Sequence, residues 1–259
     1  MEASFLIKVL VNGALGRMGK TVLAAVKADK ELQLVGAVDI FSGEFEGVKV
    51  ETDLAAALEK YKPDVMIDFT RPDVVFQNIM IALNRKVSPV VGTTGLDDAA
   101  KAKIREAAEK NNTPVFIAPN FAIGAVLMMQ LSQKVAKYMP EVEIIELHHD
   151  KKLDAPSGTA ELTAKMIAEV RPPHKQGHPD EKELLEHVRG ASYDGIRIHS
   201  VRLPGYVAHQ EVIFGGLGQT LTIRHDSTGR DSFMPGVLLA CKKVRGLKGL
   251  TIGLDKILD

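Results

Sequence analysis

Hydrophobic positions in the first 120 residues alternate between short apolar runs and stretches with helical spacing. The apolar runs are rich in β-branched residues, and they predict strands at 5–11, 34–38, 65–69, 87–91 and 115–118. The stretches between them predict helices at 17–28, 53–60, 73–85 and 97–110. Strands that alternate with helices of these lengths are typical of a parallel sheet with helices on both faces. This part of the chain is therefore predicted to be a doubly wound, Rossmann-type α/β nucleotide domain.

The pattern changes after residue 120. The predicted elements are a long apolar helix at 123–138, a strand at 142–147, a helix at 159–170, and three β segments at 195–203, 207–214 and 219–224. A polar segment rich in Pro and His, 171–190, predicts an exposed loop. Glycines between the last two β segments suit a hairpin, and a change of apolar phase in the first predicts a bulge near Ser200. A helix at 231–244 and an apolar run at 250–254 close the chain. The helices and hairpin-linked β segments after residue 120 predict an α+β domain with a mostly antiparallel sheet.

Composition excludes several classes of protein. The 259 residues are 45% hydrophobic and 25% charged with a formal net charge of zero, so no basic surface for nucleic acid is expected. No stretch approaches the length of a membrane span, and the N-terminus lacks the pattern of a signal peptide, which favours a cytoplasmic protein. The single cysteine, Cys241, lies in an apolar helical pattern and is predicted to be buried. An intrachain disulfide and a cysteine-based zinc site are excluded, and no metal site is expected.

A glycine motif follows the first predicted strand directly. Gly13, Gly16 and Gly19 form G-x-x-G-x-x-G at the start of a helix, where glycines allow a tight turn and close approach to a pyrophosphate. The N-terminus of the helix also favours an anion. Asp39 ends the second strand, where a carboxylate would bind the ribose hydroxyls of a dinucleotide. The alternatives are a plain glycine-rich turn and an acid that only ends a strand.

The residues after Asp39 bear on the choice of cofactor. Ile40 and Phe41 offer no cation to neutralise a 2′-phosphate, which favours NADH over NADPH. Arg17 and Arg71 are cations that could still supply this charge from elsewhere in the chain.

Two further loops are predicted at the carboxyl ends of strands, where ligands bind in sheets of this kind. Their backbone groups would hold a nicotinamide carboxamide, and Thr94 would reach a substrate; ordinary loop chemistry is the alternative. The loops are Gly92-Thr93-Thr94-Gly95 and Ala118-Pro119-Asn120-Phe121.

The segment 146–160, ELHHDKKLDAPSGTA, concentrates more titratable chemistry than any other. Ser157 or Thr159 would cap the helix that follows, and the N–H groups of this turn would instead suit a substrate carboxylate. Lys152 adds a positive charge. His148 and His149 are adjacent in an extended segment and so point to opposite sides, which leaves at most one to exchange protons at a given site. A surface or capping histidine is the alternative.

The longer segment 143–160, EIIELHHDKKLDAPSGTA, resembles the signature of the 4-hydroxy-tetrahydrodipicolinate reductases, also called dihydrodipicolinate reductases. The resemblance covers nearly the whole chain, including the closing helix after RDSF at 230–233. The other segments that carry it are VNGALGRMG at 11–19, IDFTRP at 67–72, VVGTTG at 90–95, APNFAIG at 118–124, IHSVRLPG at 198–205 and HQEVIFGG at 209–216.

This resemblance implies an oxidoreductase of the diaminopimelate route to lysine. The expected reaction is the pyridine-nucleotide-dependent reduction of 4-hydroxy-tetrahydrodipicolinate to tetrahydrodipicolinate with loss of water, with hydride added at ring C4 and a proton at C3. The expected domains are a dinucleotide-binding domain at 1–120 with 229–259, and a substrate-binding and oligomerisation domain at 121–228. A homotetramer and a small dicarboxylate substrate are implied, with no nucleic acid or membrane partner.

The resemblance also implies roles for individual residues. Protonation at C3 would fall to His148 or Lys152, and the sequence leaves the choice between them open. The substrate would contact His149, Lys152, Ser157, Gly158, Thr159 and Thr94. The cofactor, NADH or NADPH, would contact Gly13, Gly16, Arg17, Met18, Gly19, Asp39, Phe69, Arg71, Gly92, Thr93, Thr94, Ala118, Pro119, Asn120 and Phe121. Family members that use NADPH often place an arginine beside the acid, and this chain has Ile40 there.

Two other functions are compatible with part of the pattern. A different two-domain nicotinamide dehydrogenase would share the glycine loop and Asp39, but it has no need of HHDKKLDAPSGTA. A dinucleotide sensor without turnover would tolerate replacement of His148 or Lys152.

Overall fold

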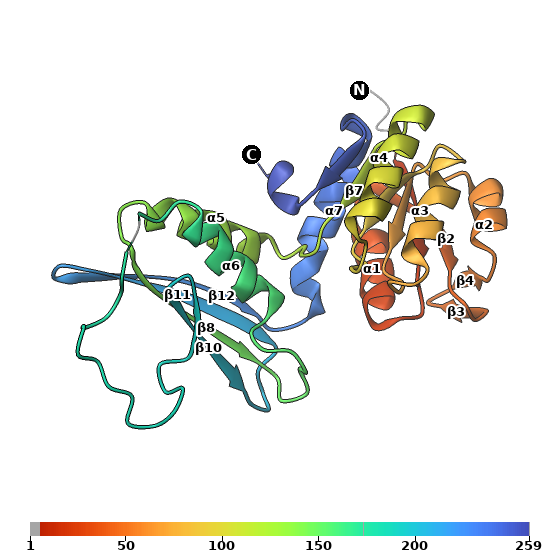
Figure 1. The fold of residues 1–259 in the computed structure, drawn as a ribbon. Helices are drawn as coiled ribbons and strands as arrows, with labels where there is room; N and C mark the ends of the chain where they lie inside the picture. Colours follow the sequence, from red (N-terminus) through yellow and green to blue (C-terminus); the bar gives the residue numbers. More distant parts are fainter. Residues whose placement is uncertain (1–5, 173, 259) are drawn as a thin grey trace. The chain divides into compact units, whose positions relative to one another are not determined.

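The computed structural model describes residues 6–172 and 174–258, and the chain divides into two compact units. Unit 1 comprises the described residues up to Ile123 together with those from Arg230 onward, and unit 2 comprises the residues from Gly124 to Gly229. Figure 1 shows that the last part of the chain, in blue, returns to the unit formed by the first part.

Unit 1 is built on an eight-stranded sheet in the order β13-β7-β6-β5-β1-β2-β4-β3. All neighbouring strands are parallel except β3, which pairs antiparallel with β4 at one edge. The strands are β1 (Ile7–Asn12), β2 (Leu32–Val38), β3 (Gly43–Phe45), β4 (Val48–Glu51), β5 (Val65–Asp68), β6 (Ser88–Val91), β7 (Val115–Ile117) and β13 (Leu250–Ile252). The predicted doubly wound α/β class is confirmed, although β3 and β4 were not predicted because they are short and mostly polar. Residue 5, where the first strand was predicted to begin, lies outside the described residues.

Helices cover both faces of this sheet (Figure 1). One layer pairs α1 with α7, and in the other α3 contacts both α2 and α4. Side chains start two of these helices, because Asp53 accepts a hydrogen bond from Ala56 N and Asp97 accepts one from Ala100 N. The helices are α1 (Arg17–Ala28), α2 (Leu54–Tyr61), α3 (Val75–Leu83), α4 (Asp98–Asn111) and α7 (Met234–Lys243), the last preceded by a 3-10 turn at Arg230–Phe233.

The central strands of unit 1 are buried on both faces. All four residues of β5 and β6 and the last four of β1 are buried, which is why these strands appear in the sequence as unbroken apolar runs. Cys241 on α7 is also fully buried, as predicted, and its burial raises the pKa of the thiol.

Unit 2 is built on a five-stranded sheet in the order β12-β11-β8-β10-β9. Only the β8–β10 pair is parallel, so the predicted mostly antiparallel sheet is confirmed. Helix α6 contacts β8, β9 and β10, and α5 lies on the same side of the sheet (Figure 1). The strands are β8 (Glu141–His148), β9 (Ala191–Tyr193), β10 (Ile196–Arg202), β11 (Ala208–Gly216) and β12 (Gln219–Ser227), and the helices are α5 (Ile123–Ala136) and α6 (Gly158–Ala168).

The other side of this sheet is called the open face here. It carries alternate residues of β8 and β11, such as Glu143, Ile145 and Ile213, which are only partly exposed. The predicted hairpin is confirmed as β11 and β12. No helix or strand forms among the described residues of the predicted loop 171–190.

The predicted bulge near Ser200 is wrong. Strand β10 pairs with β8 in one continuous register from Arg197 to Arg202. Ile196 and Ile198 are buried on the helix-covered face, whereas Val201 lies on the open face and is partly exposed. The apolar phase therefore changes because both faces of the strand carry apolar residues, and the backbone stays regular.

No helix in the described part of the chain is long and apolar enough to cross a membrane. Residues 6–172 and 174–258 also contain no group of three or more His, Cys, Asp or Glu side chains placed to hold a metal ion.

Candidate active site

The glycine loop of unit 1 is folded so tightly that two of its glycines cannot be replaced. Gly13 has φ +80°, and a Cβ atom there would lie 2.4 Å from Phe69 O. A Cβ atom at Gly19 would lie 2.0 Å from Gly13 O. The loop thus presses against the start of α1 and against the residues that follow β5, as the glycine motif predicted.

Asp39 is held over this loop by backbone groups. Its Oδ2 atom accepts a hydrogen bond from Leu15 N at 2.8 Å, and its Oδ1 atom accepts one from Ile40 N at 2.7 Å. Because the side chain is only half-buried, its carboxylate keeps acceptor capacity for a ligand hydroxyl.

Unit 1 contains a cavity of about 530 Å³ beside Asp39. Pockets for small ligands have volumes of about 300–1,000 Å³, so this cavity can take one. Five of the predicted cofactor residues line it: Gly13, Gly16, Asp39, Phe69 and Arg71. The lining residues that were not predicted for the cofactor are Asn12, Leu15, Val38, Ile40, Phe41, Thr52, Leu54, Thr70, Asp73, Val74 and Asn78. The glycine cradle, the acid and the apolar walls fit the adenosine half of a dinucleotide.

Two lining residues set the chemical character of the cavity. Ile40 and Phe41 are 76% and 68% exposed, which is unusual for large apolar side chains and suits stacking against a flat ring. Arg71 is the one cation among the described lining residues, and it forms an ion pair with Asp73 at 2.9 Å.

A buried carboxylate that was not predicted from the sequence connects the neighbouring loops by hydrogen bonds. Asp68, at the end of β5, is fully buried. Its Oδ2 atom accepts hydrogen bonds from Asn12 Nδ2 and Asn78 Nδ2, both at 2.9 Å. Its Oδ1 atom accepts from the Thr70 hydroxyl at 2.7 Å, the Thr93 hydroxyl at 2.9 Å and Thr70 N at 3.1 Å. The Thr93 hydroxyl thus hydrogen-bonds within the protein, to Asp68.

The loops that follow β6 and β7 meet around aromatic rings. A Cβ atom at Gly92 would lie 2.0 Å from Phe69 Cε1, so the Phe69 ring rests on this glycine. The rings of Phe69 and Phe121 are 5.9 Å apart, and Phe121 is only 2% exposed. The Phe121 side chain is therefore part of the core, and only the backbone of this residue is able to contact a ligand.

The remaining predicted cofactor residues lie around this region without lining the cavity. Arg17, Thr94 and Pro119 are exposed, Met18 and Asn120 are half-buried, and Ala118 is buried.

In unit 2, a second buried carboxylate contacts one of the two predicted catalytic residues, His148. Glu146 on β8 is fully buried, and its Oε2 atom lies 2.6 Å from His148 Nδ1. Arg202, on the neighbouring strand β10, donates to both oxygens of Glu146, at 2.8 Å and 2.7 Å. Ser157 N donates to Oε1 at 3.2 Å. His148 is 15% exposed, whereas His149 is exposed, as expected for adjacent residues of an extended segment.

The same arginine also anchors the loop that carries Lys152. Arg202 Nη2 donates to Asp154 O at 2.8 Å. The Lys152 ammonium contacts both carboxylate oxygens of Asp154 at 2.8 Å, and this ion pair lowers the pKa of Asp154. A substrate carboxylate that uses Lys152 must therefore compete with Asp154.

The Ser-Gly-Thr turn starts helix α6 as predicted. The Ser157 hydroxyl accepts a hydrogen bond from Ala160 N at 3.2 Å and so caps the helix. A Cβ atom at Gly158 would meet nothing within 4 Å, so the end of the helix opens onto free space. Thr159 follows half-buried in the first turn. This is a suitable place for an anion, since the N-terminus of a helix attracts negative charge.

The electrostatics of Glu146 follow from its partners. Burial raises the pKa of this carboxyl, but hydrogen bonds from His148, Arg202 and Ser200 outweigh burial and lower the pKa to about 2. Glu146 is therefore ionised throughout the neutral range.

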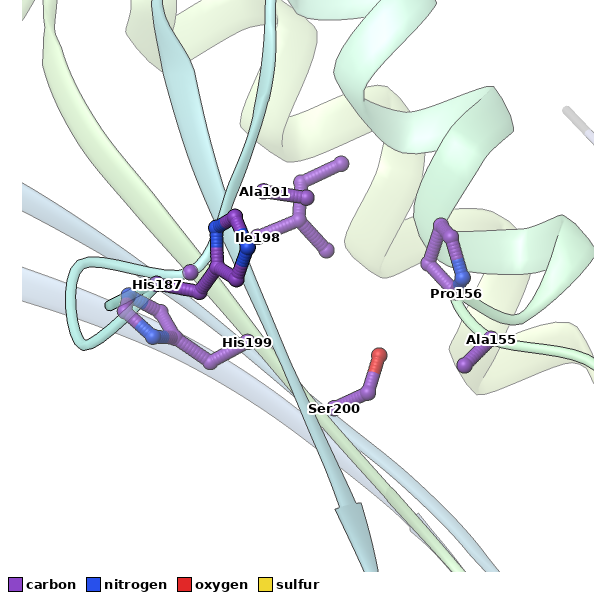
Figure 2. A pocket seen from close by; sticks show the side chains of 8 residues that line it. Ala155, Pro156, His187, Ala191, Ile198, His199 and Ser200 are labelled. Carbon is purple, nitrogen blue, oxygen red and sulfur yellow. The ribbon is translucent and has the colours of Figure 1, made fainter. Parts of the chain in front are cut away.

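A cavity of about 400 Å³ flanks this cluster in unit 2 (Figure 2). In Figure 2 Ser200 stands between Ala155 and Pro156 on one side and His187 and His199 on the other. Ser200 also donates a hydrogen bond to Glu146, so this cavity adjoins the Glu146 cluster.

Glu146, Arg202 and Asp154 were not predicted as site residues. The sequence contains a signal for Glu146, because residues two apart in a strand share a face and Glu146 precedes His148 by two. Arg202 is 56 residues away from Glu146 in the chain, and only the pairing of β8 with β10 brings it there.

Comparisons with known proteins agree over both units. The family described as dihydrodipicolinate reductase, N-terminus, matches residues 7–121, and dihydrodipicolinate reductase, C-terminus, matches residues 124–258. The chain is 51% identical to a 4-hydroxy-tetrahydrodipicolinate reductase of Desulfitobacterium hafniense over 98% of this chain and 99% of the relative. It is 53% identical to a protein of the same name from Listeria welshimeri, over 98% of this chain and 100% of the relative.

A solved structure is similar over the same extent. It is a dipicolinate-bound dihydrodipicolinate reductase from Paenisporosarcina sp. TG-14, which matches with a TM-score of 0.92 and 49% identity. The match covers 98% of this chain and 100% of that one.

Proposed function

The chain belongs to the dihydrodipicolinate reductase family, and we propose that it reduces 4-hydroxy-tetrahydrodipicolinate to tetrahydrodipicolinate with loss of water. The reaction is a step of the diaminopimelate route to lysine. One observation carries the proposal: the segment most specific to the family places His148, Lys152 and the Ser157 turn around one buried cluster in unit 2. A structure of the family with dipicolinate, a ring with two carboxylates, supports a dicarboxylate substrate.

The residues of unit 2 suit such a substrate. Lys152 supplies a positive charge, and the start of α6 at Ser157, Gly158 and Thr159 supplies a second anion site, so each ring carboxylate has a partner. His149, which is exposed beside them, would add a further donor.

The reaction needs a hydride at ring C4 and a proton at C3. The bound nicotinamide would supply the hydride. His148 is the better candidate for the proton, because Lys152 is occupied by an anion both in this structure and in the proposed complex. Lys152 would then act mainly by electrostatic stabilisation of the substrate.

For the cofactor we propose NADH in preference to NADPH. Asp39 would accept hydrogen bonds from the ribose hydroxyls, and a 2′-phosphate there would be repelled by its carboxylate. Gly13 and Gly16 would let the backbone approach the pyrophosphate, and the loops at 92–95 and 118–121 would hold the nicotinamide end.

This cofactor assignment can be tested with two variants of the same cavity. Asp39→Ala should lower kcat/KM for NADH about tenfold, the effect of one or two lost hydrogen bonds, while NADPH changes less. Asp73→Ala is the matched control, because it removes an acid from the same cavity and releases Arg71 from its ion pair. It should raise kcat/KM for NADPH. Equal losses with both cofactors in Asp39→Ala would remove the ribose assignment.

The activity itself is tested by following the loss of reduced nicotinamide absorbance, with substrate formed in place from pyruvate and aspartate semialdehyde. Rapid oxidation that depends on substrate is expected with NADH. A folded protein that binds NADH but turns over neither cofactor would contradict the proposed activity.

We further propose that the enzyme is a cytoplasmic homotetramer that associates through unit 2. Strand β12 is a sheet edge whose first four residues are all exposed, and an unpaired edge of this kind needs cover. The partly exposed Ile145 and Ile213 of the open face would be covered in the same assembly. Light scattering that shows a monomer at micromolar concentration would contradict this arrangement.

A further inference from the structure

We propose that Glu146 is a positioning residue for His148: it fixes which ring nitrogen carries the proton and locks the histidine to the turn that begins α6. The inference rests on the proposed function, because it assigns a role within the same site. The Glu146 side chain is fully buried, so it can act on the substrate only through its neighbours.

The contacts of Glu146 connect three parts of the chain. Its carboxylate lies 2.6 Å from His148 Nδ1 on the same strand and accepts a hydrogen bond from Ser157 N at 3.2 Å. Both of its oxygens also accept hydrogen bonds from Arg202. Because Arg202 also binds Asp154 O, the loop that holds Lys152 is anchored to the same carboxylate. A shift of Glu146 would move the histidine and the anion-binding turn together.

The protonation state of His148 follows from this geometry. The carboxyl of Glu146, whose pKa is about 2, is ionised in the neutral range and can only accept hydrogen bonds. The close Nδ1 atom of His148 must therefore carry a hydrogen and donate it to Glu146. This leaves Nε2 as the nitrogen that exchanges a proton with substrate.

Arg202 makes this arrangement possible. An unpaired buried carboxylate is strongly unfavourable, and the two parallel hydrogen bonds from Arg202 compensate its charge. With the negative charge already matched by Arg202, the contact with His148 is left to set orientation and tautomer.

The first test replaces the charge and keeps the shape. In Glu146→Gln the amide can either donate to or accept from His148 Nδ1, so both tautomers become accessible. We expect kcat to fall about tenfold or more with little change in NADH binding, because a histidine in the wrong tautomer cannot exchange the proton. The ring ¹⁵N spectrum, with the His148 signals identified by their loss in His148→Ala, should change from a single Nδ1–H tautomer to a mixture.

The second test asks whether Glu146 acts through His148. Adding Glu146→Gln to His148→Ala should lower kcat by less than about twofold, because the group that Glu146 positions is already gone. Glu146→Asp keeps the charge in a shorter side chain, and it should retain the Nδ1–H tautomer with a smaller loss of kcat. If Glu146→Gln does not fold, Glu146→Asp provides the test of the positioning role instead.

The chain contains a matched control on the same strand. Glu143 contacts His199 Nε2 at 2.8 Å and an arginine, Arg189, at 2.5 Å, but on the open face of the sheet. Glu143→Gln removes the same kind of group from the same strand, and it should leave kcat within about twofold once both proteins have the same oligomeric state.

The outcomes separate this inference from the proposed activity. If the wild-type protein does not reduce the substrate, the proposed function fails. If the wild type is active but Glu146→Gln keeps full kcat and a single His148 tautomer, only the positioning role is overturned. Equal fold losses in the wild-type and His148→Ala backgrounds would also overturn it, because a purely structural role predicts that result.

Discussion

Removing one hydroxyl group at Thr93 should destabilise unit 1 and loosen the loops around its cavity. Thr93 is 7% exposed, and valine has almost the same shape, so Thr93→Val deletes only polar contacts. Its hydroxyl donates to Asp68 Oδ1 at 2.9 Å and accepts from Thr70 N at 2.8 Å. The substitution therefore takes a donor from a fully buried carboxylate and an acceptor from a backbone N–H group.

The expected magnitude follows from what remains. A hydrogen bond to a charged group contributes about 1.5–3 kcal/mol, and an orphaned buried group costs a similar amount. Asp68 keeps its bonds from Asn12, Asn78 and Thr70, and Thr70 N keeps a 3.1 Å contact with Asp68. We therefore expect the lower end, about 2 kcal/mol, which corresponds to a fall in Tm of about 4–8 °C for a protein of this size.

The assay is thermal unfolding followed by circular dichroism, together with titration of NADH by its fluorescence. Thr251→Val, on the partly exposed edge strand β13, is the matched control and should change Tm by less than about 1 °C. NADH binding should weaken in Thr93→Val alone, because Thr70 and Phe69 belong to the loop that lines the cavity.

A Tm of Thr93→Val within about 1 °C of the wild type would contradict this expected loss of stability. It would mean that the hydroxyl contributes no net free energy to the Asp68 cluster. Normal stability with weakened NADH binding would instead assign the hydroxyl to the cofactor.

The remaining predictions concern acid stability, substrate affinity and backbone fit. The folded pKa of Glu146, about 2, is below its ordinary value of 4.5. The ionised carboxylate therefore stabilises the fold fully above pH 4.5, and this stabilisation is lost as the pH falls toward 2. The stabilisation amounts to about 3 kcal/mol, of which about 1.5 kcal/mol should be lost by pH 3.5. Urea unfolding at pH 6 and 3.5 should show this loss in the wild type and a smaller one in Glu146→Gln. Asp154→Asn releases Lys152 from its ion pair, so the substrate KM should fall by up to about fivefold at low salt, and a threefold rise would show that Asp154 positions the lysine instead. Gly19→Ala should fail to give stable folded protein because its Cβ atom would meet backbone at 2.0 Å, whereas Gly158→Ala, with nothing within 4 Å, should fold with unchanged Tm.

Much of unit 1 could be predicted because its signals are local. Helix α1 begins at Arg17 and ends at Ala28, the predicted bounds. Asp53 and Asp97 cap two more helices, which were predicted at 53–60 and 97–110. Strands buried on both faces give apolar runs that need no tertiary context to recognise. In unit 2 the same reasoning failed at Ser200, since a strand with two apolar faces has no single phase to read.

Spacing along a few turns or strands is enough to predict the alternation of elements, the glycine loop with Asp39, and the segment that carries His148, Lys152 and Ser157. Which charges these residues meet depends on the tertiary fold. The pairing of β8 with β10 brings Arg202 to Glu146 across 56 residues, and the pairing of β5 with β6 places Thr93 beside Asp68. Buried carboxylates are stable only where donors from several strands converge on them, and that convergence is a property of the sheet and of no single segment.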